Sequence, residues 1–150
     1  MDADSRDLGV LEGRLAYQFR DLELLMRALT HPSYAHEHPP PRSNETLAFL
    51  GDAVLDLIVA ERLYGKAPDD GPGSMTQRRA ELVSARGLAA WAGRLDLPAC
   101  LRLGRGEDQG GGRAKESVLA TALEAVIAAV YLDGGLAPAR ALIVRLMDES

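Results

Sequence analysis

The sequence predicts an all-α domain. Between the breaks in the chain, apolar residues recur with the spacing of helices, and no segment alternates with the period of two that marks a strand. The two strongest breaks are the proline-rich segment 36–43 (HEHPPPRS) and the glycine-rich segment 107–112 (EDQGGG). Three consecutive prolines exclude a helix from the first segment, and the glycines of the second favour a mobile loop.

Two shorter breaks lie at 66–73 and 133–135. Five helices are expected in the segments between the breaks. Asp21 begins the first helix, Ser43 or Asn44 can cap the second, and Ser74 can cap the third. Asp-Gly-Gly at 133–135 ends the fourth helix, and a proline stands near the start of the last. The expected helices span about 21–29, 44–64, 74–95, 116–132 and 138–147.

Length and composition indicate one globular domain over residues 1–150. The single cysteine, Cys100, excludes an intrachain disulfide or a cysteine-based zinc site and favours an intracellular protein. The N-terminus carries no apolar secretion signal, and the longest apolar stretch, 118–132, is shorter than the ~20 residues of a membrane span. We therefore expect a cytoplasmic protein without a membrane partner. The glycine-rich loop lacks the phosphate-binding pattern G-x-x-x-x-G-K-[ST], so no nucleotide cofactor is expected.

The net charge of −5 and the pI of about 5.2 are unusual for a protein that binds nucleic acid, because contact with phosphates needs lysine and arginine. Two considerations weaken this objection. The basic residues are clustered, and a dimer would repeat each cluster. Acidic residues at a metal site are also part of how nucleases work.

The predicted helix 44–64 has an apolar side and an acidic side. Glu45, Ala48, Asp52 and Asp56 follow one another along the acidic side at helical spacing. Phe49 also falls on this side, where it either contacts a partner subunit or packs under a loop of its own chain. The positions expected in the core are Leu47, Leu50, Val54, Leu57 and Ile58.

Glu124 is the only charged residue between Ser117 and Leu132. A buried carboxylate must be paired, hydrogen-bonded or metal-bound, and an ion pair with an arginine is the simplest explanation for Glu124 alone. Taken together with Asp52, however, Glu124 indicates a site for a divalent cation. Mg²⁺ accepts one or two protein carboxylates, with water and substrate phosphate completing its coordination.

Three blocks of the sequence resemble the ribonuclease III family. Residues 44–55 (NETLAFLGDAVL) are similar to its signature N-E-x-L-E-F-L-G-D-A-x-L, and residues 29–35 (LTHPSYA) and 115–135 (KESVLATALEAVIAAVYLDGG) resemble two further blocks. The blocks occur in the family's order and spacing, and the resemblance extends from about residue 11 to 146. It implies a helical endonuclease domain that forms a homodimer. It also implies hydrolysis of double-stranded RNA with Mg²⁺, for which Mn²⁺ is an expected substitute, leaving 5′-phosphate and 3′-hydroxyl ends.

The resemblance assigns roles to individual residues. Asp52 and Glu124 occupy two of the family's four catalytic, metal-binding acid positions, whereas Ala48 and Thr121 stand at the other two. Thr121 is then expected to act on the metal only through water. Three further residues complete the expectation: Asn44 and Glu45 support the site, and Phe49 contacts the partner subunit.

The loss of two acids leaves two interpretations open. One is a non-catalytic relative that binds RNA or a ribosomal partner without cleaving it. The other is an active enzyme, because the short Mini-III branch of the family has the same two replacements and also lacks an RNA-binding domain. In either case Arg113 and Lys115, which precede the helix of Glu124, are the expected RNA contacts.

Overall fold

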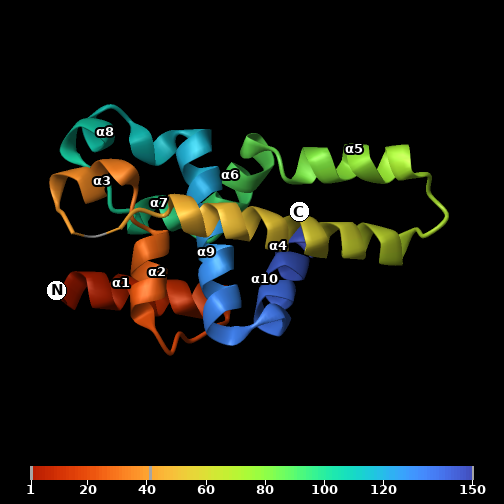
Figure 1. Cartoon of the computed structure of the whole chain (residues 1–150), viewed down its shortest axis with the longest axis horizontal. Helices are drawn as coiled ribbons and strands as arrows, with labels where there is room; N and C mark the ends of the chain where they lie inside the picture. Colours follow the sequence, from red (N-terminus) through yellow and green to blue (C-terminus); the bar gives the residue numbers. More distant parts are fainter. Residues whose placement is uncertain (1, 41, 150) are drawn as a thin grey trace.

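Helix α9 (Glu116–Gly134) forms the centre of the fold (Figure 1). The computed structural model describes residues 2–40 and 42–149, and within them it contains helices but no strand. Four other helices, α2, α4, α6 and α10, pack around α9. The remaining bounds are α1 Asp2–Leu15, α2 Leu22–Ala28, α3 Pro32–Glu37, α4 Glu45–Lys66, α5 Pro72–Leu82, α6 Ala85–Arg94, α7 Leu97–Cys100, α8 Arg105–Gln109 and α10 Leu136–Asp148, with a 3₁₀ turn at Gly112–Ala114.

The all-α prediction is confirmed, and the apolar composition of α9 explains its central place. Its residues from Ala125 to Val130 are all buried, so this helix has little surface left for solvent. At 19 residues α9 is long and apolar enough to cross a membrane, which corrects our expectation about its length. Here that apolar surface is covered by neighbouring helices of the same chain.

The longest helix, α4, crosses α9 with the two backbones in direct contact. A Cβ atom added to Gly51 would lie 1.7 Å from the backbone oxygen of Glu124, far inside any allowed contact. Only glycine therefore permits this approach. The contact brings Asp52, the next residue of α4, beside the side chain of Glu124.

The chain differs from the sequence-based prediction in several places. The expected helix 74–95 is divided at Ser84, whose side chain accepts a hydrogen bond from the Gly87 N–H and starts α6 as its N-cap. Helices α1, α3 and α7 were not predicted. The last two residues of α3, 36 and 37, belong to the segment expected to be free of helix, and α8 includes residues 107–109 of the expected glycine-rich loop. Leu57 was expected in the core but is 54% exposed, because α9 and α10 cover other faces of α4. Pro41 of the expected proline-rich loop, like Met1 and Ser150, lies outside the described residues.

The expected cap Ser74 is wrong, because α5 already begins at Pro72 with Gly71 at its N-cap and Ser74 lies inside the helix. The ends expected at Asp21 and at residues 133–135 are confirmed. The Asp21 side chain caps α2 by accepting a hydrogen bond from the Glu23 N–H. For α4 the capping side chain is that of Ser43, whose Oγ accepts from the Glu45 N–H at 3.4 Å. The Asn44 side chain makes no capping bond and instead donates from Nδ2 to the carbonyl of Ala28. Gly135, with φ of 90°, ends α9 in a conformation that favours glycine.

The two ends of the chain are fastened to the central helices. Asp133, at the end of α9, accepts hydrogen bonds from the Tyr17 hydroxyl and from the N–H groups of Arg20 and Asp21. At the other end, Arg62 of α4 donates two hydrogen bonds to Asp148 of α10. The core is consequently continuous from Leu8 to Leu146.

The Gly51 contact predicts unequal effects of two glycine substitutions in α4. Gly51→Ala should lower the free energy of unfolding by about 3 kcal/mol, because the new methyl group forces the two helices apart. Gly65→Ala, where a Cβ meets nothing within 4 Å, should instead raise it by about 0.5–1 kcal/mol through helix propensity. Urea denaturation of the two variants beside the wild type measures both effects, and equal stabilities would contradict the close crossing.

Candidate active site

Asp52 and Glu124 form a carboxyl pair at the crossing of α4 and α9. Asp52 lies on the exposed side of α4, whereas Glu124 is partly buried in α9. Burial raises the pKa of Glu124 to about 8, with further contributions from its hydrogen bond with Asp52 and from the negative charges of Asp52 and Asp56. This raised pKa favours the protonated form of the Glu124 carboxyl at neutral pH, with the hydrogen bond joining it to the Asp52 side chain.

A third acid, Asp56, lies one helical turn beyond Asp52. Burial raises its pKa, and the charge of Asp52 raises it further, while Arg79 of α5 lowers it. The charges of Asp52 and Asp56 thus both act on the Glu124 carboxyl across the helix crossing, and the charge of Asp52 also acts on Asp56. Arg79 is the cation that opposes them at Asp56. Glu124 considered alone suggested a simple ion pair with an arginine. In the structure its hydrogen-bond partner is instead a second acid, Asp52.

The carboxyl pair fits a divalent cation of the magnesium type. Such an ion needs only one or two protein carboxylates, with water and substrate filling its other positions. No group of three or more His, Cys, Asp and Glu residues is arranged to hold a metal within residues 2–40 and 42–149. Asp52 and Glu124 would therefore have to hold the ion mainly by themselves.

The two replaced acid positions border this pair. Ala48 precedes Asp52 by one turn of α4 and is buried, and Thr121 precedes Glu124 by one turn of α9 and is partly buried. Residues at these spacings lie on the same side of a helix. The structure thus places both replacements next to the carboxyl pair, where neither supplies a charge.

The two supporting residues, Asn44 and Glu45, occupy different environments. Asn44 is only 2% exposed, and it holds α4 against α2 through its bond to Ala28 and through its own N–H, which donates to the Thr30 carbonyl. Glu45 is exposed in the first turn of α4 and accepts a hydrogen bond from Ser43. It precedes Asp52 by seven residues, or about 10 Å along the helix, so it does not join the carboxyl pair.

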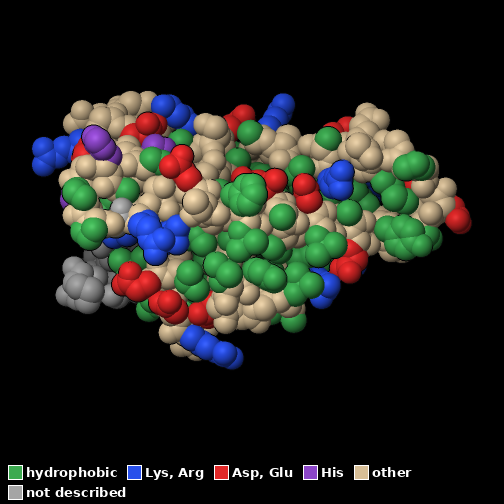
Figure 2. Space-filling model, in the orientation of Figure 1, with side chains coloured by type: hydrophobic (Ala, Val, Ile, Leu, Met, Phe, Trp, Pro, Cys, Tyr) green, Lys and Arg blue, Asp and Glu red, His purple; other side chains and the backbone are tan. Residues whose placement is uncertain are grey.

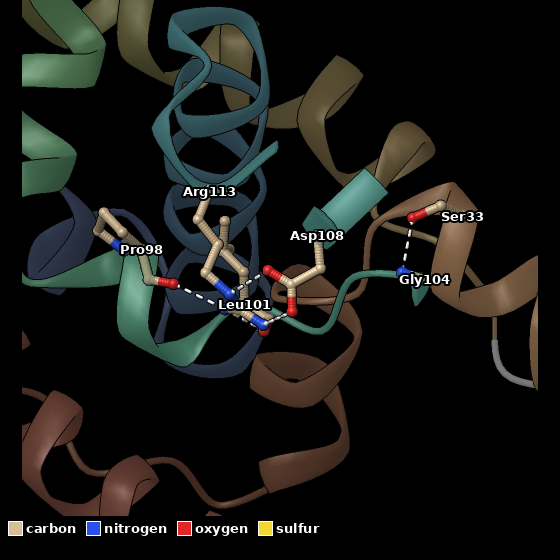
Figure 3. A network of polar contacts seen from close by, with 6 residues as sticks. All are labelled: Ser33, Pro98, Leu101, Gly104, Asp108 and Arg113. Atoms are coloured by element: carbon tan, nitrogen blue, oxygen red, sulfur yellow. Dashed lines mark hydrogen bonds and ion pairs between the residues drawn. The ribbon is translucent and has the colours of Figure 1, made fainter. Parts of the chain in front are cut away.

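Arg113 is the centre of a structural network rather than a free cation (Figure 3). Its guanidinium donates to the Asp108 carboxylate and to the backbone carbonyls of Pro98 and Leu101. It thereby fixes α7 against the turn that precedes α9. Lys115 is exposed and donates to Glu107 at 2.8 Å. The RNA-binding role of these two residues stays a prediction, and the contacts of Arg113 favour a structural role.

Phe49 stands on the surface with 84% of its side chain exposed, so it does not pack under a loop of its own chain. Leu57 and Tyr64 of the same helix are also exposed, and with Phe49 and Ala53 they form an apolar strip along α4. Figure 2 shows hydrophobic side chains gathered along α4 on this face, with acidic side chains at their border. Apolar surface of this kind marks an interaction site.

Sequence reasoning missed two features of the site. One is the role of Gly51, for which a glycine inside a long helix was the available signal, since such a residue often marks a close approach of backbones. The other is the charge of Arg79 near Asp56, which joins two helices that sequence spacing does not relate.

The protein is an all-α domain with a carboxyl pair at the crossing of its two longest helices, and this is the class of the helical nuclease domains to which it is similar. The family model described as ribonuclease-III-like matches residues 21–149. The chain is 48% identical over 143 residues to Ribonuclease 3 of Caldanaerobacter subterraneus, covering 95% of this chain and 63% of that protein. It is 50% identical over 147 residues to Ribonuclease 3 of Streptomyces coelicolor, covering 98% of this chain and 53% of that protein.

The solved nuclease domain of ribonuclease III from Campylobacter jejuni superposes with a TM-score of 0.87 at 40% identity, covering 93% of this chain and 95% of that one. The study of that domain describes structural flexibility in the region involved in dimer formation. This chain belongs to the ribonuclease III family, as its sequence blocks indicated. It spans between about half and two-thirds of the length of the curated relatives it matches.

The raised pKa of Glu124 predicts a pH dependence of stability in the metal-free protein. Between its usual value of 4.5 and about 8 the folded state holds a proton that the unfolded state releases. Stability from this group is therefore fully present below pH 4.5 and is lost as the pH rises to about 8. Glu124→Gln removes this dependence, so at pH 8 the variant should melt about 3–6 °C above the wild type. Thermal melting of both proteins in EDTA from pH 5 to 9 measures the difference, and parallel curves would contradict the shift.

Proposed function

We propose that this domain is an endoribonuclease that hydrolyses double-stranded RNA as a cytoplasmic homodimer, using Mg²⁺ or, in its place, Mn²⁺. The observation that carries the proposal is the carboxyl pair, in which Asp52 and Glu124 are hydrogen-bonded to each other at the helix crossing. Such a pair has a negative charge to offer a cation once Glu124 loses its proton. The family to which the chain belongs supports the reaction class.

In this proposal Asp52 and Glu124 hold the divalent ion. Because Glu124 is protonated at neutral pH without metal, binding of the ion displaces that proton, and affinity should increase with pH. The chemistry that such an ion supplies is activation of water and stabilisation of negative charge on a phosphodiester. Thr121 can orient a water molecule beside Glu124 through its hydroxyl. Glu45, about 10 Å along α4 from Asp52, lies where it can border bound RNA but not the reacting phosphate.

The apolar strip on α4 supports the homodimer. Phe49 is a large aromatic side chain that finds no partner surface within the described part of the chain. Aromatic anchors of this type are enriched at the centres of protein interfaces. A second copy would bury the strip and place two carboxyl pairs in one particle.

The specific observation that favours a second candidate function is the absence of charge at Ala48 and Thr121, beside the carboxyl pair. With two acids in place of four, the site attracts a divalent ion less strongly. The domain would then be a dimer that binds RNA or a ribosomal partner without cleaving it.

Cleavage of a long RNA duplex separates the two functions. Purified protein with Mg²⁺ or Mn²⁺ should cut the duplex, and EDTA should prevent cutting. Asp52→Asn and Glu124→Gln should each reduce the rate by at least about 100-fold, since each removes a charge that holds the ion. Both variants should keep the oligomeric state of the wild type in analytical ultracentrifugation. A folded wild type that cuts with neither metal would overturn the nuclease and favour the binding function.

The role of the apolar strip can be tested through Phe49→Ala. Truncation of a central aromatic anchor costs about 2 kcal/mol or more, so the dissociation constant of the dimer should rise by about 30-fold. Val10→Ala, at an apolar position of α1 that is 52% exposed, serves as the control and should leave it unchanged. Sedimentation velocity over a concentration series measures both, and equal constants would show that Phe49 does not contact a second copy.

A further inference from the structure

A groove of about 330 Å³ lies beside α2 and the segment that precedes α4, and three arginines line it. Arg27 comes from α2, Arg42 precedes α4, and Arg102 follows α7. We call this feature the arginine groove. Figure 2 shows basic side chains over the junction of α2 and α4, on the face that also carries the hydrophobic side chains of α4.

Arg102 is held in place by neutral groups. Its Nε and Nη2 atoms donate to the hydroxyl of Thr30 at 3.1 and 2.7 Å. Its guanidinium also lies over the ring of Tyr34, 4.7 Å from the centroid. These contacts fix the orientation of the side chain without cancelling its charge.

Arg27 is fixed in the same manner. Its Nε donates to the carbonyl of Ser43 at 3.2 Å, and its Nη2 donates to the hydroxyl of Thr46. Burial lowers the pKa of Arg27, and the positive charge of Arg42 lowers it further. Two guanidinium groups therefore face each other closely enough to repel.

The positive charge of the groove is only partly balanced. None of the three arginines forms an ion pair with an acid among the described residues, whereas Arg62, Arg113 and Arg140 all do. Asp21 and Glu23 also line the groove, but the Asp21 carboxylate is engaged in capping α2. Three guanidinium groups against two carboxylates leave an excess of one positive charge. Oriented arginines with an excess of positive charge are an arrangement that binds phosphate.

We propose that the arginine groove binds backbone phosphates of the RNA duplex, outside the carboxyl pair. The inference rests on the proposed function and adds a contact to it that positions the RNA. Thr46, which anchors Arg27, precedes Asp52 by six residues, or about 9 Å along α4. Thr46 and Asp52 are also about 120° apart around the helix axis. The proposal therefore requires a duplex broad enough to contact two neighbouring sides of α4. The groove also answers the difficulty of a net charge of −5, because a few exposed cations suffice where they are not neutralised.

The salt dependence of RNA binding tests this proposal. Arg42→Gln and Arg27→Gln are compared with Arg140→Gln, which removes the same charge from an arginine already paired with Glu61. Binding of a short blunt RNA duplex is followed by fluorescence anisotropy in EDTA over a KCl series. Each groove variant should reduce the slope of log K against log[KCl] by about 1 and weaken binding at low salt by about fivefold. The control variant should match the wild type.

The outcomes separate the two proposals. Slopes of the groove variants equal to that of Arg140→Gln would overturn the arginine groove while the proposed function stands. A weaker dimer in sedimentation velocity with an unchanged slope would also overturn it, since the groove would then contact acids of a second copy. A wild type that binds no duplex at low salt would overturn the proposed function itself. If Arg27→Gln unfolds, Arg42→Gln decides the matter alone, because Arg42 is exposed.

Discussion

The direct backbone contact between α4 and α9 is the constraint on which the site depends. Gly51 lets the two helices touch at the carbonyl of Glu124, and this contact alone brings an exposed acid and a partly buried one together. A carboxylate in the position of Glu124 would be costly by itself. The hydrogen bond with Asp52 reduces that cost in the absence of a cation. The same helix crossing therefore brings the two acids together and lowers the free-energy cost of burying Glu124.

The arginines of this acidic domain fall into two groups with different consequences. Arg113 and Arg62 donate to carboxylates and join helices to one another, so their charge is used within the fold. Arg27 and Arg102 are oriented by hydroxyl groups, a carbonyl and an aromatic ring, so their charge remains available outside it. The sequence shows only that arginines are present. Which of them can meet a phosphate depends on what each one contacts in the fold.

The helical fold and the two acids could be predicted from the sequence because both rest on local spacing. Apolar periodicity located α2, α4, α9 and α10, and a lone charge in an apolar helix drew attention to Glu124. The division at Ser84 was missed because serine caps a helix in one context and is tolerated inside one in another. The exposure of Leu57 and the network of Arg113 could not be predicted, since both depend on segments that are distant in sequence.

The replacements at Ala48 and Thr121 lower the number of acids at the crossing of α4 and α9, and they also change its electrostatics. Four carboxylates in one place would repel one another strongly and would need a cation to fold without strain. Two carboxylates can instead satisfy each other with a single proton, as the raised pKa of Glu124 indicates. The two acids therefore satisfy each other without metal, and under the proposed function the same proton would compete with the ion for Glu124. The loss of two carboxylates would thus have two effects. It would weaken the attraction of the site for a divalent ion, and it would let the fold form without one.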